Sequence, residues 1–276
     1  MYKRQVHFHL NVDVGGETRF EDLWAKHDAM LVATGVYKAR DIATLGSGLD
    51  GIVPALEYLT ASNQKSLGDQ VEAFENGTLN AENKDVVVIG GGDTAMDCVR
   101  TAIRQKAKSV SCLYRRDRAN MPGSQREVQN AEEEGVVFKW LSAPQAFLGD
   151  VKVGAVQAQR IHLGQPDATG RQVPEVIEGS KYELPADMVI KALGFDPEDL
   201  PAMFGQKGLE VTRWGTLKID WRTMMTNLDG VFAAGDIVRG ASLVVWGVRD
   251  GRDAAEAIDK WIVASVDAPR AAGVGR

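Results

Sequence analysis

Apolar runs in the middle of the chain are separated by a stretch with helical periodicity, and this pattern predicts strands that alternate with a helix. Residues 86–89 form a short β-branched run, and residues 109–114 read as a second strand. The residues between the two runs follow a helical pattern. The order strand, helix, strand predicts a βαβ unit with parallel strands.

The turn that leads from the first strand into the helix carries the candidate chemistry. It reads G-x-G-x-x-A and consists of Gly90, Gly91, Gly92, Asp93, Thr94 and Ala95. Gly90 permits a tight turn, Gly92 lets a pyrophosphate approach the backbone, and Ala95 lets the helix lie close to the sheet. The helix N-terminus offers free N–H groups and a partial positive charge to phosphates. The pattern predicts a dinucleotide-binding unit, and a glycine turn in another kind of α/β protein is the alternative.

The end of the second strand indicates which dinucleotide is bound. Enzymes that use NAD usually place an acidic residue there, where it binds the ribose 2′-hydroxyl. This chain instead has Tyr114, Arg115, Arg116, Asp117 and Arg118. Guanidinium groups pair well with a phosphate, so the three arginines predict NADPH rather than NADH. A solvated basic loop is the alternative, and Asp117 keeps it open.

Two parts of the chain resemble each other. Residues 28–35 and 187–194 are both apolar strands that end in Ala-x-Gly, and residues 6–10 resemble residues 136–140. The similarity predicts two related dinucleotide-binding units. The second unit is complete, but the same offset places the glycine turn of the first unit before residue 1. The first unit is therefore expected to be incomplete.

Local signals mark further boundaries in these units. Residues 124–127 read as a capping box that opens a helix, and Gly135 reads as its stop. Residues 46–51 match G-x-G-x-x-G, but the residues before them do not form a buried strand, so we expect a loop there. His7 and His9 alternate with apolar residues, as on the polar face of a strand.

The last part of the chain carries a second candidate cofactor segment. Residues 211–220 are a predicted hairpin, and the segment 230–240 begins with an apolar strand that ends in Gly235 and Asp236. A helix is predicted from about Ser242 to Ala264. The carboxylate can hold a ribityl hydroxyl, and the helix N-terminus can face the pyrimidine of a flavin. A strand–turn–helix with an N-capping aspartate is the alternative.

Composition and charge narrow the class of protein. Of the 276 residues, 44% are hydrophobic and 25% are charged, as in ordinary soluble globular proteins. The net charge of −6 argues against a nucleic-acid-binding protein. No apolar run reaches the roughly 20 residues that span a bilayer, and the first residues do not resemble a signal peptide. These features predict a cytoplasmic protein without a membrane partner.

Cysteine and histidine usage gives no metal site. Cys98 and Cys112 occupy positions typical of packing in the helix and in the second strand. Two cysteines cannot supply the four ligands of an iron–sulfur cluster, so these ligands are absent from the chain. The four histidines show no metal spacing. Hydride transfer requires alignment of two rings rather than a side-chain catalyst, so we assign no catalytic residue.

Three segments resemble the small (β) subunits of bacterial NADPH-dependent glutamate synthases. They are residues 88–98, 114–124 and 233–246, and residues 31–40 fit the same family. In this family the small subunit transfers hydride from NADPH to FAD. Electrons then pass through iron–sulfur clusters to the large (α) subunit, which makes glutamate from 2-oxoglutarate and glutamine. The resemblance implies an oxidoreductase whose partner is that large subunit.

The resemblance also implies roles for the candidate residues. The glycine turn, Gly90 to Ala95, would hold the NADPH pyrophosphate, and Arg115, Arg116 and Arg118 would hold the 2′-phosphate. The residues expected near FAD are Thr34, Gly35, Gly235 and Asp236. The family also has a cysteine-rich N-terminal region and a first glycine turn for the FAD pyrophosphate, neither of which occurs in this sequence. The chain is thus expected to match the C-terminal part of a longer protein and to bind little FAD alone.

Two other functions remain open from the sequence. One is a non-catalytic NADPH-binding fragment. The other is a subunit of a related NADPH oxidoreductase that reduces pyrimidines or serves a ferredoxin-linked partner.

The expected fold is α/β, with two related Rossmann-like domains of the flavin disulfide-reductase type, the first of them incomplete. We expect a partial FAD-binding domain at 1–82, an NADPH-binding domain at 83–193, and a return to the FAD-binding domain at 194–276. The central domain should have a parallel sheet with helices on both faces and an antiparallel insert near 150–185. The strand within 28–35 should lie beside residues 230–236.

Overall fold

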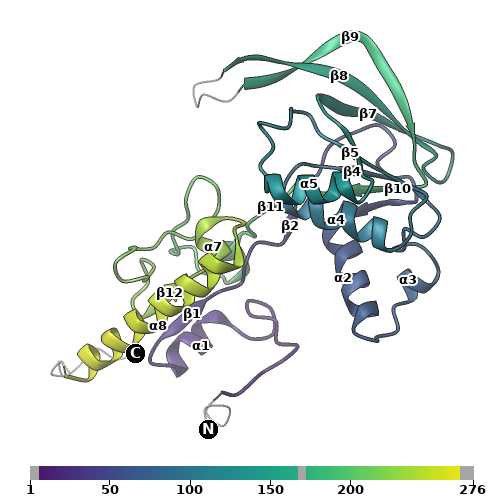
Figure 1. The fold of residues 1–276 in the computed structure, drawn as a ribbon. Coiled ribbons are helices and arrows are strands. Elements are labelled where there is room, and N and C mark those ends of the chain that lie inside the picture. Colours follow the sequence, from purple (N-terminus) through teal and green to yellow (C-terminus); the bar gives the residue numbers. More distant parts are fainter. Residues whose placement is uncertain (1–5, 167–171, 268–276) are drawn as a thin grey trace. The chain divides into compact units, whose positions relative to one another are not determined.

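The computed structural model describes residues 6–166 and 172–267, and these residues form two compact units. Unit 1 consists of residues 1–38 and 195–276, and unit 2 consists of residues 39–194. Figure 1 shows the elements of both units. The chain passes between the units through two short paired strands, β2 (Lys38–Ala39) and β11 (Phe195–Asp196).

A five-stranded parallel sheet forms the centre of unit 2 (Figure 1). Its strands follow the order β3 (Ile52–Pro54), β10 (Met188–Lys191), β4 (Asp85–Ile89), β5 (Ser109–Leu113) and β6 (Val137–Lys139). Each strand is parallel to its neighbours. The predicted strand–helix–strand unit is confirmed, because α4 (Asp93–Arg104) connects β4 to β5.

The side chains of β4 alternate between two hydrophobic cores. Val86 and Val88 pack with the helices α2 (Ala55–Ser66), α4 and α5 (Gln125–Glu133). Val87 and Ile89 point to the opposite face, where they pack with apolar residues of a second sheet. A strand that is buried on both faces needs apolar residues at successive positions, which explains the uninterrupted run Val86 to Ile89.

The second sheet of unit 2 is antiparallel and consists of β7 (Ser142–Leu148), β8 (Ala155–Pro166) and β9 (Gln172–Pro185). The antiparallel insert is thus confirmed. The prediction of helices on both faces of the parallel sheet is wrong, because the antiparallel strands cover one face. Phe147, Val156 and Leu184 contribute the apolar side chains that exclude water from that face.

Unit 1 is built on two parallel strands, β1 (Met30–Val32) and β12 (Val231–Ala233). Their pairing confirms that residues 28–35 lie beside residues 230–236. Helix α1 (Phe20–Lys26) and the short helix α6 (Leu200–Met203) pack on one side, where Phe20 and Phe204 stack with ring centroids 4.9 Å apart.

On the other side of these strands, Phe232 contacts Trp261 of the long helix α8 (Val244–Asp267), edge to face at 6.1 Å. The short helix α7 (Asp236–Arg239) lies between β12 and α8 in sequence.

The division between the units differs from the predicted domain boundary at residue 82. Residues 39–82 belong to unit 2, because β3 hydrogen-bonds to β10 and α2 packs on α4. The same segment contains the short helix α3 (Glu72–Glu75). The boundary predicted at residue 193 lies one residue from the observed division.

Several local predictions can be compared with the described residues. The loop at 46–51 is confirmed, and Gly135, with φ of +100°, follows the last turn of α5 as predicted. The predicted hairpin at 211–220 is reduced to a turn with one antiparallel bridge, Val211 to Leu217. The helix predicted from about Ser242 begins at Val244 and continues to Asp267.

Two local predictions are wrong. Residues 6–10 do not form a strand, and Phe8 is 81% exposed, because no described strand lies beside this segment. Ser124 occupies the N-cap of α5, but its side chain makes no capping hydrogen bond.

Among the described residues, no helix is both long and apolar enough to cross a membrane.

Candidate functional site

The turn at Gly90 lies at the carboxyl end of β4, in the middle of the parallel sheet. Gly90 has φ of +152°, and a Cβ atom there would lie 2.1 Å from the carbonyl oxygen of Ala192. A Cβ atom on Gly91 would lie 2.3 Å from the Tyr114 ring. Both contacts are too short for any side chain. These two glycines are therefore required by the packing of the protein itself.

Gly92 differs from its two neighbours. It is the N-cap of α4, with φ of −90°, and a Cβ atom there would meet no protein atom within 4 Å. The space beside its backbone is thus open, and the first N–H groups of a helix have no partner within the helix. Ala95 is fully buried against the sheet, as predicted. Of the three glycines, Gly92 is the one whose missing Cβ leaves room for a ligand.

The loop before α5 is fastened to the glycine turn. The N–H of Gly123 donates to the carbonyl oxygen of Gly91 at 2.9 Å. The N–H of Ser124 donates to Oδ1 of Asp93 at 2.9 Å. Asp93 thus holds the start of α5 beside the start of α4, a role that the sequence analysis did not assign. In the sequence, only the position of Asp93 in the first turn of the helix could have indicated this role.

The three predicted arginines have different surroundings. Arg118 is engaged by Glu132, with Nη1 to carboxylate distances of 2.9 and 2.7 Å. Arg116 donates from Nη2 to the carbonyl oxygen of Gln172 at 3.2 Å, and its buried Nε has no partner among the described residues. Arg115 is exposed and makes no side-chain hydrogen bond or ion pair with the described part of the chain. Arg115 is the arginine most available to a phosphate.

The second candidate cofactor segment lies in unit 1, where β1 and β12 end side by side. The N–H of Ala234 donates to the carbonyl oxygen of Val32 at 3.1 Å. The structure therefore brings Thr34 and Gly35 to the same edge as Gly235 and Asp236, since parallel strands end at the same edge of a sheet. Gly235 has φ of +78°, and a Cβ atom there would have no neighbour within 4 Å.

The alternative role of Asp236 as an N-cap does not hold, because Gly235 is the N-cap of α7 and Asp236 is the first helical residue. An acidic residue that the sequence analysis missed lies nearby. Asp250 of α8 has a buried side chain that pairs with Arg239, whose backbone N–H donates to the carbonyl oxygen of Gly235 at 3.1 Å. A lone aspartate in an otherwise ordinary helix gave no signal of this contact.

Both cysteines pack in the core of unit 2, as predicted. Cys98 and Cys112 are completely buried and free. Burial raises the pKa of the Cys112 thiol to about 12, and it raises the pKa of Cys98 further. Neither thiol is thus reactive near neutral pH. Among the described residues, no group of three His, Cys, Asp or Glu side chains could hold a metal ion.

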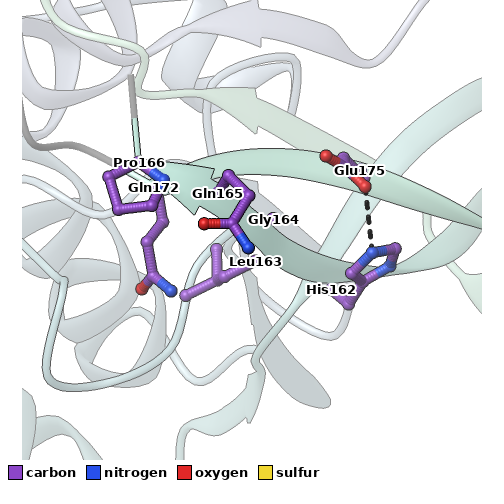
Figure 2. A pocket seen from close by; sticks show the side chains of 7 residues that line it. All are labelled: His162, Leu163, Gly164, Gln165, Pro166, Gln172 and Glu175. Carbon is purple, nitrogen blue, oxygen red and sulfur yellow. Dashed lines mark ion pairs between the residues drawn. The ribbon is translucent and has the colours of Figure 1, made fainter. Parts of the chain in front are cut away.

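A hollow of about 400 Å³ occurs on the β8–β9 ribbon (Figure 2). It is lined by His162, Leu163, Gly164, Gln165, Pro166, Gln172 and Glu175. In Figure 2, Nε2 of His162 faces Oε2 of Glu175, and these atoms are 3.0 Å apart. Both side chains are more than half exposed. The hollow contains none of the predicted cofactor-binding residues.

The sequence matches one protein family over most of its length. The family profile described as "Pyridine nucleotide-disulphide oxidoreductase" matches residues 4–265. This chain belongs to the pyridine nucleotide-disulphide oxidoreductase family. The two glycine turns at the ends of parallel strands agree with that assignment.

Named relatives within this family are glutamate synthase small chains. The chain is 67% identical to "Glutamate synthase [NADPH] small chain" of Azospirillum brasilense, over 96% of this chain and 55% of that protein. It is 44% identical to the protein of the same name from Halomonas elongata, over 92% of this chain and 54% of that protein. The predicted resemblance is confirmed. The chain spans about half the length of these relatives.

The fold of this family member is also that of solved structures. The structure titled "Mycobacterium tuberculosis FprA in complex with NADPH" matches with a TM-score of 0.73 and 19% identity. The match covers 93% of this chain and 68% of that one. It confirms the predicted fold class, an α/β fold of the flavin disulfide-reductase type.

Proposed function

We propose that this chain is the NADPH-binding and part of the flavin-binding portion of a glutamate synthase small subunit. The observation that carries the proposal is the Gly92 turn, which is open to a ligand beside two glycines that the protein's own packing requires. The names of its relatives in the family support the choice of NADPH and of glutamate synthase. The proposed activity is hydride transfer from NADPH to a flavin.

The residues around the Gly90 turn fit a dinucleotide phosphate. The N–H groups at the start of α4 would meet the pyrophosphate, with Gly92 allowing close approach. Arg115 would pair with the 2′-phosphate, while Arg116 and Arg118 would shape the same basic edge. Asp93 would serve by holding Ser124 in place rather than by touching a phosphate, since its carboxylate would repel one.

The residues around the Gly235 turn fit one end of a flavin. Its open left-handed backbone leaves room beside β12, and Asp236 would accept a hydrogen bond from a ribityl hydroxyl. Thr34 and Gly35 would lie along the same edge. A bound flavin supplies the acceptor for hydride and passes electrons on one at a time.

Among the described residues, only the Gly90 turn has the G-x-G-x-x-A pattern between a strand and a helix, so no second turn of this kind could hold the FAD pyrophosphate. FAD would therefore be held from one end only, and we expect weak binding by this chain alone. A non-catalytic NADPH-binding fragment remains the alternative function. The large subunit as partner, glutamate synthesis as the final reaction and a cytoplasmic location belong to the proposal as well.

Titration of the purified chain with NADPH, NADH and FAD tests the proposal. We expect NADPH to bind at least about tenfold more tightly than NADH, because a charge-assisted contact contributes about 1.5–3 kcal/mol. FAD added in excess should support NADPH-dependent reduction of a dye. Equal binding of NADPH and NADH would contradict the cofactor assignment. NADPH binding without flavin uptake at any concentration would leave the non-catalytic fragment as the function.

A further inference from the structure

The carboxylate of Asp250 in unit 1 is buried and charged, and it has no role in the hydride transfer proposed above. Its side chain is 1% exposed, whereas that of its partner Arg239 is 28% exposed. The two groups form a paired contact, with Nε to Oδ2 and Nη2 to Oδ1 distances of 2.6 Å each. This two-bond geometry fixes the orientation of both side chains.

The same ion pair is connected to the candidate flavin turn. Arg239 belongs to α7, and its backbone N–H donates to the carbonyl oxygen of Gly235 at 3.1 Å. Asp250 lies on α8, and Gly235 lies between β12 and α7, so the pair links α8 to the helix that follows the turn. Gly235 adopts φ of +78°, which is open to few residues and needs support from its surroundings.

Two tryptophans hold the guanidinium of Arg239. Its Cζ lies 4.8 Å from the Trp221 ring centroid and 5.0 Å from the Trp246 ring centroid. Other charged groups close to the pair are Arg249, which attracts Asp250, and Asp253, which attracts Arg239. The stack limits the movement of Arg239 and therefore of the carboxylate that it binds.

Stability alone does not explain such a pair. Burying an ion pair costs desolvation that its attraction often only offsets, and apolar residues of similar size would stabilise the same place equally well. A charged partner is needed, however, where a particular guanidinium has to be held. Arg239 is such a group, because its backbone N–H donates to the carbonyl oxygen of Gly235, the residue immediately before the carboxylate proposed to meet the flavin.

We propose that Asp250 is a positioning residue, which, with Arg239 stacked between Trp221 and Trp246, fixes the Gly235 turn so that Asp236 can bind the ribityl chain of a flavin. This inference rests on the proposed function. Asp250 itself does not touch the flavin. Its effect passes through Arg239 and the backbone of Gly235 to the adjacent Asp236.

The test uses the whole chain and two matched variants, Asp250→Asn and Asp253→Asn. Both replace an aspartate of α8 with its amide, but Asp253 is 51% exposed and pairs only loosely with Arg249, at 3.5 Å. Amide hydrogen exchange of residues 235–240 is measured without any cofactor. FAD affinity is then measured by the change in flavin fluorescence, and NADPH affinity serves as a control for unit 2.

For Asp250→Asn we expect faster exchange at residues 235–240 by about tenfold or more, and FAD binding weaker by about tenfold or more, since a charge-assisted contact is lost. Exchange in β1 and the far half of α8 should change much less. Asp253→Asn should leave exchange and FAD affinity unchanged. Arg239→Lys, which keeps the charge but loses the planar fork, should give an intermediate result.

Three results would overturn the inference. One is unchanged exchange at residues 235–240 in Asp250→Asn. Another is faster exchange spread evenly over unit 1, which would mean a merely structural role. The third is FAD binding equal to that of the unaltered chain despite a loosened turn. If the unaltered chain takes up no flavin at all, the proposed function fails, and the exchange measurement alone decides whether Asp250 fixes the turn.

Discussion

The Gly90 turn of unit 2 and the Gly235 turn of unit 1 both join a strand to a helix, but their surroundings differ. Each follows the carboxyl end of a parallel strand and leads into a helix. Gly90 is enclosed, with the Ala192 carbonyl where a Cβ atom would lie, whereas Gly235 is open on that side. Strand β4 has parallel neighbours on both sides, but the described partner of β12 in a regular ladder is β1.

This difference shows how two similar sequence patterns can be held in different ways. The Gly90 turn is fixed by close backbone packing in the middle of a sheet. The Gly235 turn leads into α7, where Arg239 donates to the Gly235 carbonyl oxygen and pairs with one buried carboxylate of α8, Asp250. Packing of many atoms is difficult to disturb at a single point, whereas a turn held by one ion pair depends on two side chains.

The largest expected effect comes from adding a methyl group to each turn glycine. Gly90→Ala should lower the free energy of unfolding of unit 2 by about 3 kcal/mol or more, because strain and a backbone clash act together. Gly235→Ala should cost unit 1 only about 1 kcal/mol, from its left-handed φ alone. Trp140 is the one tryptophan within residues 39–194, so its fluorescence in denaturant titrations reports on unit 2. Equal losses in the two variants would contradict the comparison.

The next effect concerns the basic segment, which accompanies only the Gly90 turn. Arg115→Ala should weaken NADPH binding about tenfold or more and leave NADH binding unchanged, because a charge-assisted hydrogen bond contributes about 1.5–3 kcal/mol. Arg118→Ala is the matched control and should have a smaller effect, since Glu132 already engages that guanidinium. Binding is measured by calorimetry with both dinucleotides. A loss that is the same for NADPH and NADH would refute the 2′-phosphate assignment.

The Gly92→Ala variant distinguishes an effect on NADPH binding from an effect on stability. Gly92→Ala should weaken NADPH binding about tenfold, because the methyl group would fill the space for the pyrophosphate. It should leave stability unchanged or raise it by about 0.5 kcal/mol, since φ of −90° suits alanine. Gly208→Ala, in another glycine with open space around its Cβ position, is the control. A clear loss of stability in Gly92→Ala would mean that this glycine, like Gly90, is required by packing.

The smallest expected effect is a difference in pH dependence. Hydrogen bonding to Arg239 lowers the pKa of Asp250 below its usual value of 3.8, so unit 1 should keep this stabilisation above that pH and lose it as the pH falls through the lowered pKa. Partial desolvation, with Asp93 nearby, raises the pKa of Asp97, an exposed residue of unit 2. Asp97 should therefore destabilise unit 2 as the pH rises through its raised pKa.

Urea unfolding midpoints, measured between pH 3 and pH 7, show how the stability of each unit changes with pH. We expect changes of opposite sign for the two aspartates. Asp250→Asn should remove the acid dependence of unit 1, and Asp97→Asn should flatten the dependence of unit 2. The emission of Trp140 separates unit 2 from the five tryptophans of unit 1. If Asp250 and Asp97 contribute to stability with the same pH dependence, one of the two pKa directions is wrong.

Local sequence patterns predicted the elements whose neighbours lie nearby in the chain. The strand β4, the turn at Gly90, helix α4 and strand β5 form one continuous segment, and all were predicted. The pairing of β1 with β12 joins residues about 200 positions apart, and it was predicted because the family resemblance placed both segments beside FAD. The roles of the predicted site residues remain predictions.

Other features failed because their partners could not be read from local pattern. Residues 6–10 alternate like a strand but have no described strand beside them. The residues of the predicted capping box are present, yet Asp93 rather than the Ser124 side chain provides the local hydrogen bond. Residues 39–82 follow the first repeat in sequence but add β3 to the sheet of unit 2.

The sequence by itself determined the family, the fold class and the composition of both glycine turns, because these depend on glycine backbone freedom and on hydrophobic periodicity within short segments. The tertiary structure decided which glycine serves packing and which leaves space, which arginine stays available, and that Asp250 pairs with Arg239 after the Gly235 turn. Each of these depends on atoms brought together from separate elements of the chain: the Ala192 carbonyl at Gly90, Glu132 at Arg118, and Asp250 at Arg239.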